Sequence, residues 1–207
     1  PGSGVDTDVF RPLPPPQGHI PCIACCSRML ESKGIHDLVA ASDLLMQQNI
    51  AHRVILAGAP DPDNPKSISG ETLKSWSTKP NIEWVGHVPD VRQVWAEADI
   101  AVLPSHGGEG VPLSLVEAAA CGRPLVATDV PGCRDIVQDG LNGLLVPVGN
   151  ACALTGVLAR LVDDEALRKR MGEASVRLVA EGFTGEIVNS RTLMIYRAIL
   201  DGDETAV

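Results

Sequence analysis

The chain has 207 residues, 3% of them aromatic, and a formal net charge of −9 at pH 7. This length suits one well-buried α/β domain. The acidic charge and the few rings argue against nucleic acid as a partner, because phosphate backbones need a basic surface and single strands need stacking rings. We also expect no signal peptide and no membrane span, because the sequence shows no secretory pattern and no apolar run of about 18 residues.

The first residues predict a linker. The chain opens on a Gly/Ser segment without methionine and continues with Arg11 and a proline-rich run to Pro16. Such a composition is stiff and extended. We therefore predict an interdomain hinge over residues 1–17, a domain over 18–200 and a tail over 201–207, and we expect a fragment that begins at the hinge.

Short aliphatic runs alternate with helical patterns along the rest of the chain, which is typical of parallel strands joined by crossover helices. The predicted strands are 20–26, 53–57, 82–85, 100–103, 125–128 and 144–146. A mostly apolar arc at 3.6-residue spacing predicts the first helix, and its members are Ile35, Leu38, Ala41, Ser42 and Leu45. The last helices are expected over 150–161, 165–180 and 186–200.

Five of the six cysteines lie in or beside apolar runs, which predicts buried, reduced thiols and a cytoplasmic protein. They are Cys22, Cys25, Cys26, Cys121 and Cys133. Cys22 and Cys25 have the spacing of metal ligands, but no second pair follows at zinc-ribbon distance and the two side chains point to opposite faces of a strand. We expect no zinc site.

Candidate ligand-binding residues follow predicted strands. Residues 27–34 follow the first strand, His87 the third, 105–113 the fourth and 128–135 the fifth. Open parallel sheets bind ligands beyond the carboxyl ends of their strands. We therefore expect these segments to meet along one edge of the sheet.

Two carboxylates, Glu109 and Glu117, lie on either side of a predicted loop-to-helix junction. Gly107 and Gly108 predict a turn, and Pro112 suits the first turn of a helix because proline has no amide hydrogen to lose there. The free amides of that turn attract anions, and carboxylates accept hydrogen bonds from sugar hydroxyls. Together they predict a nucleotide-sugar site. The alternative, two solvated acids, is weakened by the apolar neighbours of Glu117, since an unpaired buried charge is costly.

Two cations, Arg28 and Lys33, follow the first predicted strand. Each supplies the positive charge that a departing diphosphate needs. The alternative interpretation is a pair of solvated loop cations. Their coincidence with the predicted anion site at residues 110–113 favours a functional role.

Several motifs share their order and spacing with one protein family. They are residues 1–6, Ser27-Arg28 with Lys33-Gly34, Val85-Gly86, Leu103-Pro104-Ser105, the pair Glu109 and Glu117, residues 117–124 and residues 140–145. With them, residues 1–200 resemble the C-terminal, donor-binding domain of the retaining glycosyltransferases with the two-lobed GT-B fold, often called group 1 or family 4. The resemblance implies a Rossmann-like open parallel sheet with helices on both faces, the C-terminal half of a GT-B fold.

The resemblance also implies roles for the site residues. Arg28 and Lys33 bind the pyrophosphate, Glu109 binds the donor sugar, and these three are the expected catalytic residues. Glu117 binds the ribose. The remaining donor-binding groups are the backbone amides of Gly110, Val111, Leu113 and Ser114, and His87 in the segment that contacts the base. The expected donor is a nucleotide diphosphate sugar, and no metal or other cofactor is expected.

By the same resemblance, the enzyme transfers the sugar to an acceptor hydroxyl with retention at the anomeric carbon, in polysaccharide or glycoconjugate biosynthesis. The expected partner is an N-terminal acceptor-binding lobe, without which the fragment is inactive. Peripheral membrane association of the full enzyme stays open, as do the nucleotide, the sugar, the acceptor and the oligomeric state.

The sequence leaves some other functions open, and it differs from the family pattern at two positions. A nucleotide-sugar epimerase, a sugar phosphorylase and a non-catalytic nucleotide-binding module stay open, whereas a dehydrogenase lacks its Gly-x-Gly-x-x-Gly motif and a hydrolase its Gly-x-Ser-x-Gly elbow. Asp61 and Asp63 lie in a proline-rich turn, where we expect no metal. The chain departs from the family pattern at Ser27, where glycine is common, and at Asp135, where glutamate is usual.

Overall fold

The structure of the chain is a computed structural model that describes residues 4–16, 18 and 20–200. Its strands are β1 (Cys22–Cys26), β2 (Arg53–Ala57), β3 (Ile82–Gly86), β4 (Ile100–Leu103), β5 (Leu125–Thr128) and β6 (Gly143–Val146). Its helices are the 3-10 turn η1 (Glu31–Lys33), α1 (Ile35–Gln47), α2 (Gly70–Trp76), α3 (Arg92–Glu97), α4 (Leu113–Ala120), α5 (Pro131–Ile136), α6 (Ala151–Asp163), α7 (Glu165–Gly182) and α8 (Gly185–Leu200).

The six strands form a parallel sheet in the order β3-β2-β1-β4-β5-β6. Every residue of β1, β4 and β5 is buried, as expected for strands that are covered on both faces. The chain builds β2 and β3 on one side of β1 and then returns to place β4 on the other side. The carboxyl ends of β1 and β4 are therefore the topological switch point, where sheets of this kind bind ligands.

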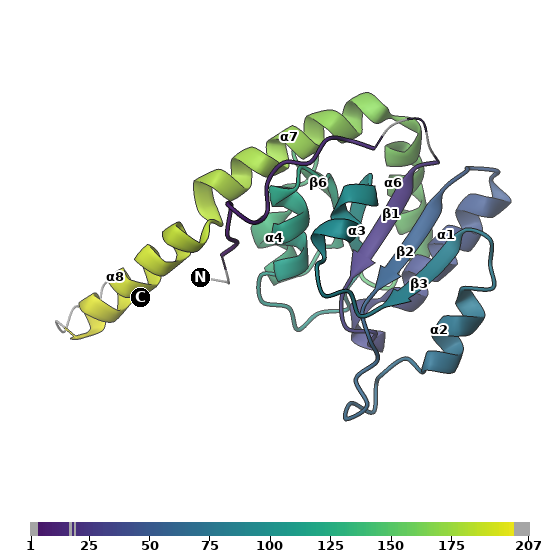
Figure 1. Ribbon diagram of the computed structural model, residues 1–207, viewed down its shortest axis with the longest axis horizontal. Helices are drawn as coiled ribbons and strands as arrows, with labels where there is room; N and C mark the ends of the chain where they lie inside the picture. Colours follow the sequence, from purple (N-terminus) through teal and green to yellow (C-terminus); the bar gives the residue numbers. More distant parts are fainter. Residues whose placement is uncertain (1–3, 17, 19, 201–207) are drawn as a thin grey trace.

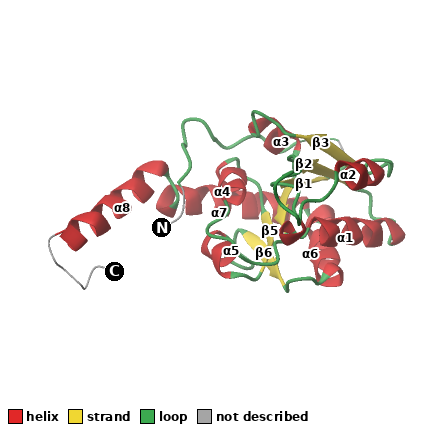
Figure 2. Ribbon diagram, turned by 90° about the horizontal axis from the view of Figure 1, so that it is seen from below, coloured by secondary structure: helices red, strands yellow, loops and turns green. Residues whose placement is uncertain are grey.

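Helices cover both faces of the sheet, which confirms the predicted architecture (Figures 1 and 2). On one face α1 packs against α6, and on the other α4 packs against α7. The second contact is close, because a Cβ at Gly172 of α7 would lie 2.2 Å from Gly122 O. The predicted arc of α1 is buried, with Ile35, Leu38, Ala41, Ser42 and Leu45 among its buried residues.

The strands agree with their predicted bounds to within two residues. β1 begins at Cys22 rather than at residue 20, because Pro21 has no amide hydrogen to give to a neighbouring strand, and Ile20 is 50% exposed. The prediction for Pro112 was wrong by one position. With φ −69° and ψ 114°, Pro112 precedes α4, and the first turn begins at Leu113.

The five cysteines predicted to lie in the core are buried, and Cys152 is exposed. Burial raises the pKa of Cys25 and of Cys133 to about 12, so both thiols stay protonated and inert at neutral pH. These cysteines act as small core side chains.

Residues 4–16 run alongside α7 (Figure 1). Backbone hydrogen bonds join Val5 to Phe183 and Gly185, at the junction of α7 and α8. Further along the segment, Arg123 Nη2 donates to Pro14 O at 3.1 Å. The division into 1–17, 18–200 and 201–207 stays a prediction, and residues 1–3, 17, 19 and 201–207 lie outside the described residues.

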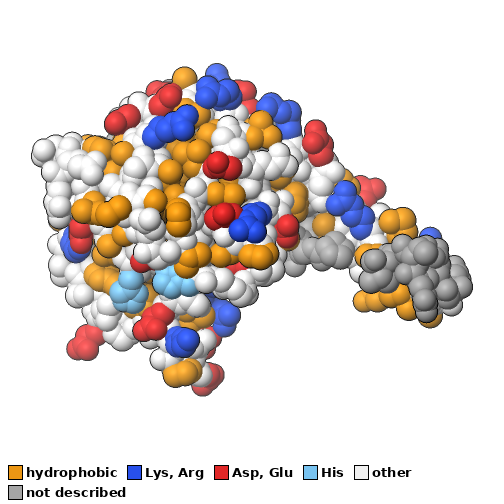
Figure 3. Space-filling model, turned by 180° about the vertical axis from the view of Figure 1, so that it is seen from behind, with side chains coloured by type: hydrophobic (Ala, Val, Ile, Leu, Met, Phe, Trp, Pro, Cys, Tyr) orange, Lys and Arg blue, Asp and Glu red, His pale blue; other side chains and the backbone are white. Residues whose placement is uncertain are grey.

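α8 projects from the body of the domain and exposes apolar side chains (Figures 1 and 3). They include Leu193, Met194, Tyr196, Ile199 and Leu200. Within the described part of the chain, no helix has the length and apolarity that crossing a bilayer requires.

Candidate functional site

The loops that follow β1 and β4 meet at the switch point. Gly34 has a φ of 67°, and a Cβ there would lie 1.9 Å from Pro104 O. The His106 amide donates to Ser32 O at 2.8 Å, and Ser105 Oγ lies 2.9 Å from the same oxygen. Glycine is therefore needed at position 34 for its left-handed backbone and for the close approach of the two loops.

This junction brings Lys33 and Glu109 together, although they are 76 positions apart. Lys33 Nζ donates to Glu109 Oε1 at 2.5 Å, and the side chains are 19% and 10% exposed. Ser105 Oγ lies 2.5 Å from the same carboxylate oxygen, and Thr128 Oγ1 donates to Ser105 O. A largely buried ion pair needs such extra hydrogen bonds to offset the loss of hydration.

Glu117 lies about one turn into α4 and is partly buried. Burial raises the pKa of its carboxyl group from 4.5 to about 7. Its charge also helps to raise the pKa of the buried Cys26 thiol, which places Glu117 near the end of β1. Among the described residues no cation pairs with Glu117. Its acceptor oxygens are therefore available to a ligand.

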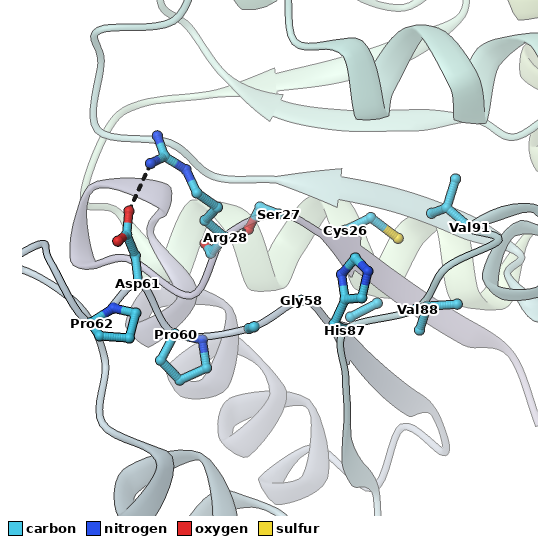
Figure 4. Close-up of a pocket in the computed structure, with 12 residues that line it drawn as sticks. Cys26, Ser27, Arg28, Gly58, Pro60, Asp61, Pro62, His87, Val88 and Val91 are labelled. Carbon is cyan, nitrogen blue, oxygen red and sulfur yellow. Dashed lines mark hydrogen bonds and ion pairs between the residues drawn. The ribbon is translucent and has the colours of Figure 1, made fainter.

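A pocket of about 360 Å³ opens at the carboxyl ends of β1, β2 and β3 (Figure 4). It is lined by Cys26, Ser27, Arg28, residues 57–62, His87, Val88 and Val91. At one end of it, Arg28 Nη1 donates to Asp61 Oδ2 at 2.9 Å, and the Arg28 side chain is 65% exposed. The pocket thus combines apolar walls with a cation at one end.

The floor of this pocket consists of backbone segments that pack directly on one another. Gly58 has a φ of 144°, and a Cβ there would lie 1.8 Å from Ser27 O. Gly58 N donates to Gly86 O at 2.7 Å, and Met29 N donates to Ala59 O at 3.0 Å. The loops after β1, β2 and β3 are therefore joined through their backbones.

The loop before α4 presents backbone amides at the start of that helix. Within the described residues, the amides of Gly110, Val111, Leu113 and Ser114 are among those of this segment that have no protein acceptor. Gly132 of α5 supports the loop from behind, because a Cβ there would lie 2.0 Å from Gly110 O. Free amides at the positive end of a helix dipole form a place for an anion.

The structure separates the two cations that the sequence groups together. Lys33 contacts Glu109, whereas Arg28 contacts Asp61, and His87 lies with Arg28 at the pocket rather than at the ion pair. Asp61 was expected to be an ordinary surface acid of a turn. It instead holds a candidate site residue, a relationship that 33 positions of separation hide in the sequence.

Sequence reasoning also missed Asp37, whose Oδ2 accepts from His106 Nε2–H at 2.6 Å. It assigned no role to Ser105, which contacts Glu109. Ser105 follows the buried strand β4 by two positions, and that place put it in the candidate segment 105–113 without indicating its contact with Glu109.

No cluster of three or more histidine, cysteine or acidic side chains suited to a metal ion occurs within the described ranges. At the Asp61 and Asp63 turn, one carboxylate is already occupied by the Arg28 guanidinium group.

Comparison with known proteins gives a consistent family. The family model described as glycosyl transferases group 1 matches residues 20–164. A D-inositol 3-phosphate glycosyltransferase of Arthrobacter is 33% identical over 213 residues, which cover 96% of the chain and 49% of that relative. The capsular polysaccharide biosynthesis glycosyltransferase CapM of Staphylococcus aureus is 26% identical over 182 residues, 88% of the chain and 47% of CapM. The chain thus spans about half the length of the curated relatives it matches.

Solved structures show the same fold. Sucrose-phosphate synthase of Thermosynechococcus elongatus matches with a TM-score of 0.82 at 26% identity, over 97% of the chain and 52% of that protein. Anabaena HepE in complex with UDP-glucose matches with a TM-score of 0.81 at 20% identity, over 94% of the chain and 56% of HepE. The C-terminal domain of the group 1 glycosyl transferase LpcC of Francisella tularensis matches at 0.73 and 23% identity, over 87% of the chain and 99% of that domain.

The sheet order, the switch-point site and these matches agree on one assignment. The domain is the C-terminal half of a GT-B fold. The chain belongs to the group 1 glycosyl transferases.

Proposed function

We propose that this chain is the donor-binding half of a glycosyltransferase that moves a sugar from a nucleotide diphosphate sugar to an acceptor hydroxyl, with retention at the anomeric carbon. The observation that carries the proposal is the contact between Lys33 and Glu109 beside the free amides that precede α4. Cationic and amide donors for a diphosphate thus lie next to an acceptor for sugar hydroxyls.

The diphosphate is bound by Lys33. Its ammonium group has three hydrogens, and Glu109 takes one of them, so two remain for phosphate oxygens. The free amides of the loop before α4 add further donors. Arg28, which is exposed, exchanges Asp61 for a phosphate oxygen. These groups stabilise the charge that develops on the leaving diphosphate. A metal ion fills this role in other enzymes. In this enzyme no essential metal is required.

The sugar is bound by Glu109. Its Oε1 is held by Lys33 and Ser105, so Oε2 is the oxygen that accepts from sugar hydroxyls. A carboxylate fixed by two partners is already oriented before the donor arrives. This preorganisation places the anomeric carbon next to the diphosphate-binding groups.

The nucleoside is bound in the pocket of about 360 Å³. His87, Val88 and Val91 line it and pack against the base, while Glu117, close to Cys26 at its inner end, accepts from the ribose hydroxyls. The solved HepE complex contains UDP-glucose, which makes UDP and UDP-glucose the first probes to use.

The acceptor is bound by another part of the full-length enzyme, the N-terminal lobe of the GT-B fold, and transfer requires both halves. The chain covers about half of its relatives' length, which supports this division.

Six free cysteines support a reducing compartment, the cytoplasm. CapM, which is named for capsular polysaccharide biosynthesis, supports a role in polysaccharide or glycoconjugate biosynthesis.

Calorimetric titration of the chain tests donor binding, with three matched pairs: UDP and UDP-glucose, GDP and GDP-mannose, ADP and ADP-glucose. We expect one pair to bind, with the sugar adding affinity.

Proton NMR of the product made by the full-length enzyme tests retention, because the anomeric coupling constant distinguishes the two configurations. Absence of binding for all six probes, or an inverted product, contradicts the corresponding part of the proposal.

A further inference from the structure

His106 and Asp37 form a pair beside the proposed donor-sugar site. His106 Nε2–H donates to Asp37 Oδ2 at 2.6 Å. Asp37 lies in the first turn of α1 and is 19% exposed, while His106, in the loop after β4, is 42% exposed. Neither side chain takes part in the proposed binding of the diphosphate or the nucleoside.

His106 is held at two points. Its ring nitrogen Nε2 is bound to Asp37, and its backbone amide donates to Ser32 O at 2.8 Å. The preceding residue, Ser105, contacts Glu109 Oε1 at 2.5 Å. The ring is therefore held in a fixed relation to the carboxylate that binds the sugar. A carboxylate that holds one nitrogen of a histidine is a common way to orient the other.

The second ring nitrogen of His106, Nδ1, has no protein partner among the described residues. The loop next to it borders open space, because a Cβ at Gly107 or at Gly108 would meet no atom within 4 Å. An imidazole nitrogen in such a place can hydrogen-bond a hydroxyl group of a ligand. His106 thus offers a fixed polar atom beside a space where a ligand can lie.

We propose that His106 Nδ1 hydrogen-bonds a hydroxyl group of the donor sugar, and that Asp37 is the positioning residue that orients the ring. The inference rests on the proposed function, because it requires the sugar next to Glu109. It makes His106 a determinant of sugar specificity. A sugar that lacks the matching hydroxyl leaves a polar ring atom unpaired in the complex, and such mismatches are discriminated more strongly than a missing methylene group.

The experiment compares a nucleotide sugar with the nucleoside diphosphate that lacks the sugar, starting with UDP-glucose and UDP. We expect His106→Ala to lower the affinity for UDP-glucose by roughly 3- to 10-fold, the size of one hydrogen bond, and to leave the affinity for UDP unchanged. His36→Ala is the matched control, because His36 is exposed and its ring packs on Trp76. It should change neither affinity.

Two conservative variants separate the sugar contact from a purely structural role. His106→Asn keeps a polar atom near the position of Nδ1 but loses the contact with Asp37. His106→Gln keeps a donor for Asp37 but has no polar atom at Nδ1. The proposal expects Asn to retain more UDP-glucose affinity than Gln. The reverse order assigns His106 to the loop contact alone and overturns the proposal.

Asp37 provides an independent test. Asp37→Ala should reduce the affinity for UDP-glucose without affecting UDP, and Asp37→Asn, whose amide oxygen still accepts from Nε2–H, should restore part of it. Asp43→Asn on the same helix is the control, since Asp43 pairs with Lys79 instead. Unchanged UDP-glucose affinity in His106→Ala, with UDP binding intact, overturns this inference and leaves the proposed function standing. A wild-type chain that binds none of the nucleotide pairs overturns both.

Discussion

Lys33 Nζ lies 2.5 Å from Glu109 Oε1, and this contact joins the turn after β1 to the loop after β4. The two loops also share the Ser32 carbonyl oxygen, which accepts from the His106 amide. A ligand that touches either charged group therefore acts on both loops.

Replacing Lys33 by alanine should reduce the turnover of the full-length enzyme at least about tenfold, if the ammonium group contributes roughly 1.4 kcal/mol to the transition state. Steady-state kinetics with the donor varied gives kcat and KM. Lys74→Ala is the control, because Lys74 is an exposed cation of α2 away from the switch point. Turnover of Lys33→Ala equal to that of the wild type would falsify the assignment of Lys33.

The same ion pair predicts a stability effect. Lys33→Ala leaves the Glu109 carboxylate, which is 10% exposed, without its cation, and we expect a loss of about 1–3 kcal/mol in the free energy of unfolding. The double variant Lys33→Ala with Glu109→Gln should recover part of this loss, because no charge is then stranded. Urea unfolding of the single and double variants measures the coupling. Additive losses would show that the pair contributes nothing beyond its separate side chains.

Glu117 predicts a pH dependence of donor binding. Its pKa of about 7 means that the carboxylate, the better acceptor for ribose hydroxyls, is the minority form below that pH. Affinity for a nucleotide sugar should rise by up to about tenfold from pH 6 to pH 8. A nucleotide sugar is the suitable probe, because it has no terminal phosphate that titrates near pH 6.

The control for this prediction is Glu117→Gln, which cannot ionise. Calorimetry of both proteins across the pH range isolates the contribution of Glu117 from that of all other groups. Parallel pH profiles for the two proteins would contradict a role for the Glu117 carboxylate in binding.

Gly132→Ala should disturb the loop that carries Glu109. The new Cβ would lie 2.0 Å from Gly110 O and 2.5 Å from Glu109 O, so the loop has to shift. We expect lower thermal stability together with weaker donor binding. Gly156→Ala is a contrasting control, because Gly156 lies in the exposed middle of α6 with open space around it, and alanine should stabilise that helix by about 0.5–1 kcal/mol. Donor affinity unchanged by Gly132→Ala would show that the loop adapts.

His52 predicts loss of stability in acid. Nδ1–H donates to Ile50 O at 2.9 Å, and Nε2 lies 2.8 Å from Ser42 Oγ and 3.1 Å from Asn81 Nδ2. Burial lowers the pKa of His52 below 6.5. The unfolded chain therefore takes up this proton first as the pH falls, and the stabilising contribution present above pH 6.5 is lost below it.

Urea unfolding at pH 7.5 and pH 5.5 checks this effect. His52→Ala should cost about 1–3 kcal/mol at pH 7.5, because its polar partners lose a hydrogen bond, and should flatten the dependence on pH. The exposed His36→Ala variant should keep the wild-type slope. An unaltered slope in His52→Ala would assign the acid sensitivity to another group.

The strands of the sheet could be predicted closely because they are nearly continuous aliphatic runs. Short runs of this kind, which must be buried, fit few structures other than a strand that is covered on both faces. The loops that carry Lys33 and Glu109 could also be predicted to meet, because both follow strands whose carboxyl ends lie at one edge of the sheet. Ser42 was also placed on the buried arc of α1, yet its polar partners could not be inferred, because His52 and Asn81 come from other elements. Buried polar contacts depend on register between elements, which apolar periodicity does not encode.

The position of Arg28 could not be predicted for a related reason. A long exposed side chain selects among nearby acceptors, and the selection depends on the path of the loop after β2. Prolines around Asp61 predict a turn but not its direction. The course of that loop follows instead from backbone pairing, such as that of Leu30 with Ser67.

In the proposed nucleoside pocket, the floor, where a Cβ at Gly58 would lie 1.8 Å from Ser27 O, limits how a new base preference can arise. The shape of the pocket floor is defined by the peptide groups of three loops, which are hydrogen-bonded to one another. Exchanging one side chain therefore leaves that shape intact. Redesign for a different purine or pyrimidine therefore calls for chimeras that transplant residues 57–67 together with 85–91 from a donor-matched relative. Point substitution at the pocket wall should tune affinity while the order of preference among bases stays the same.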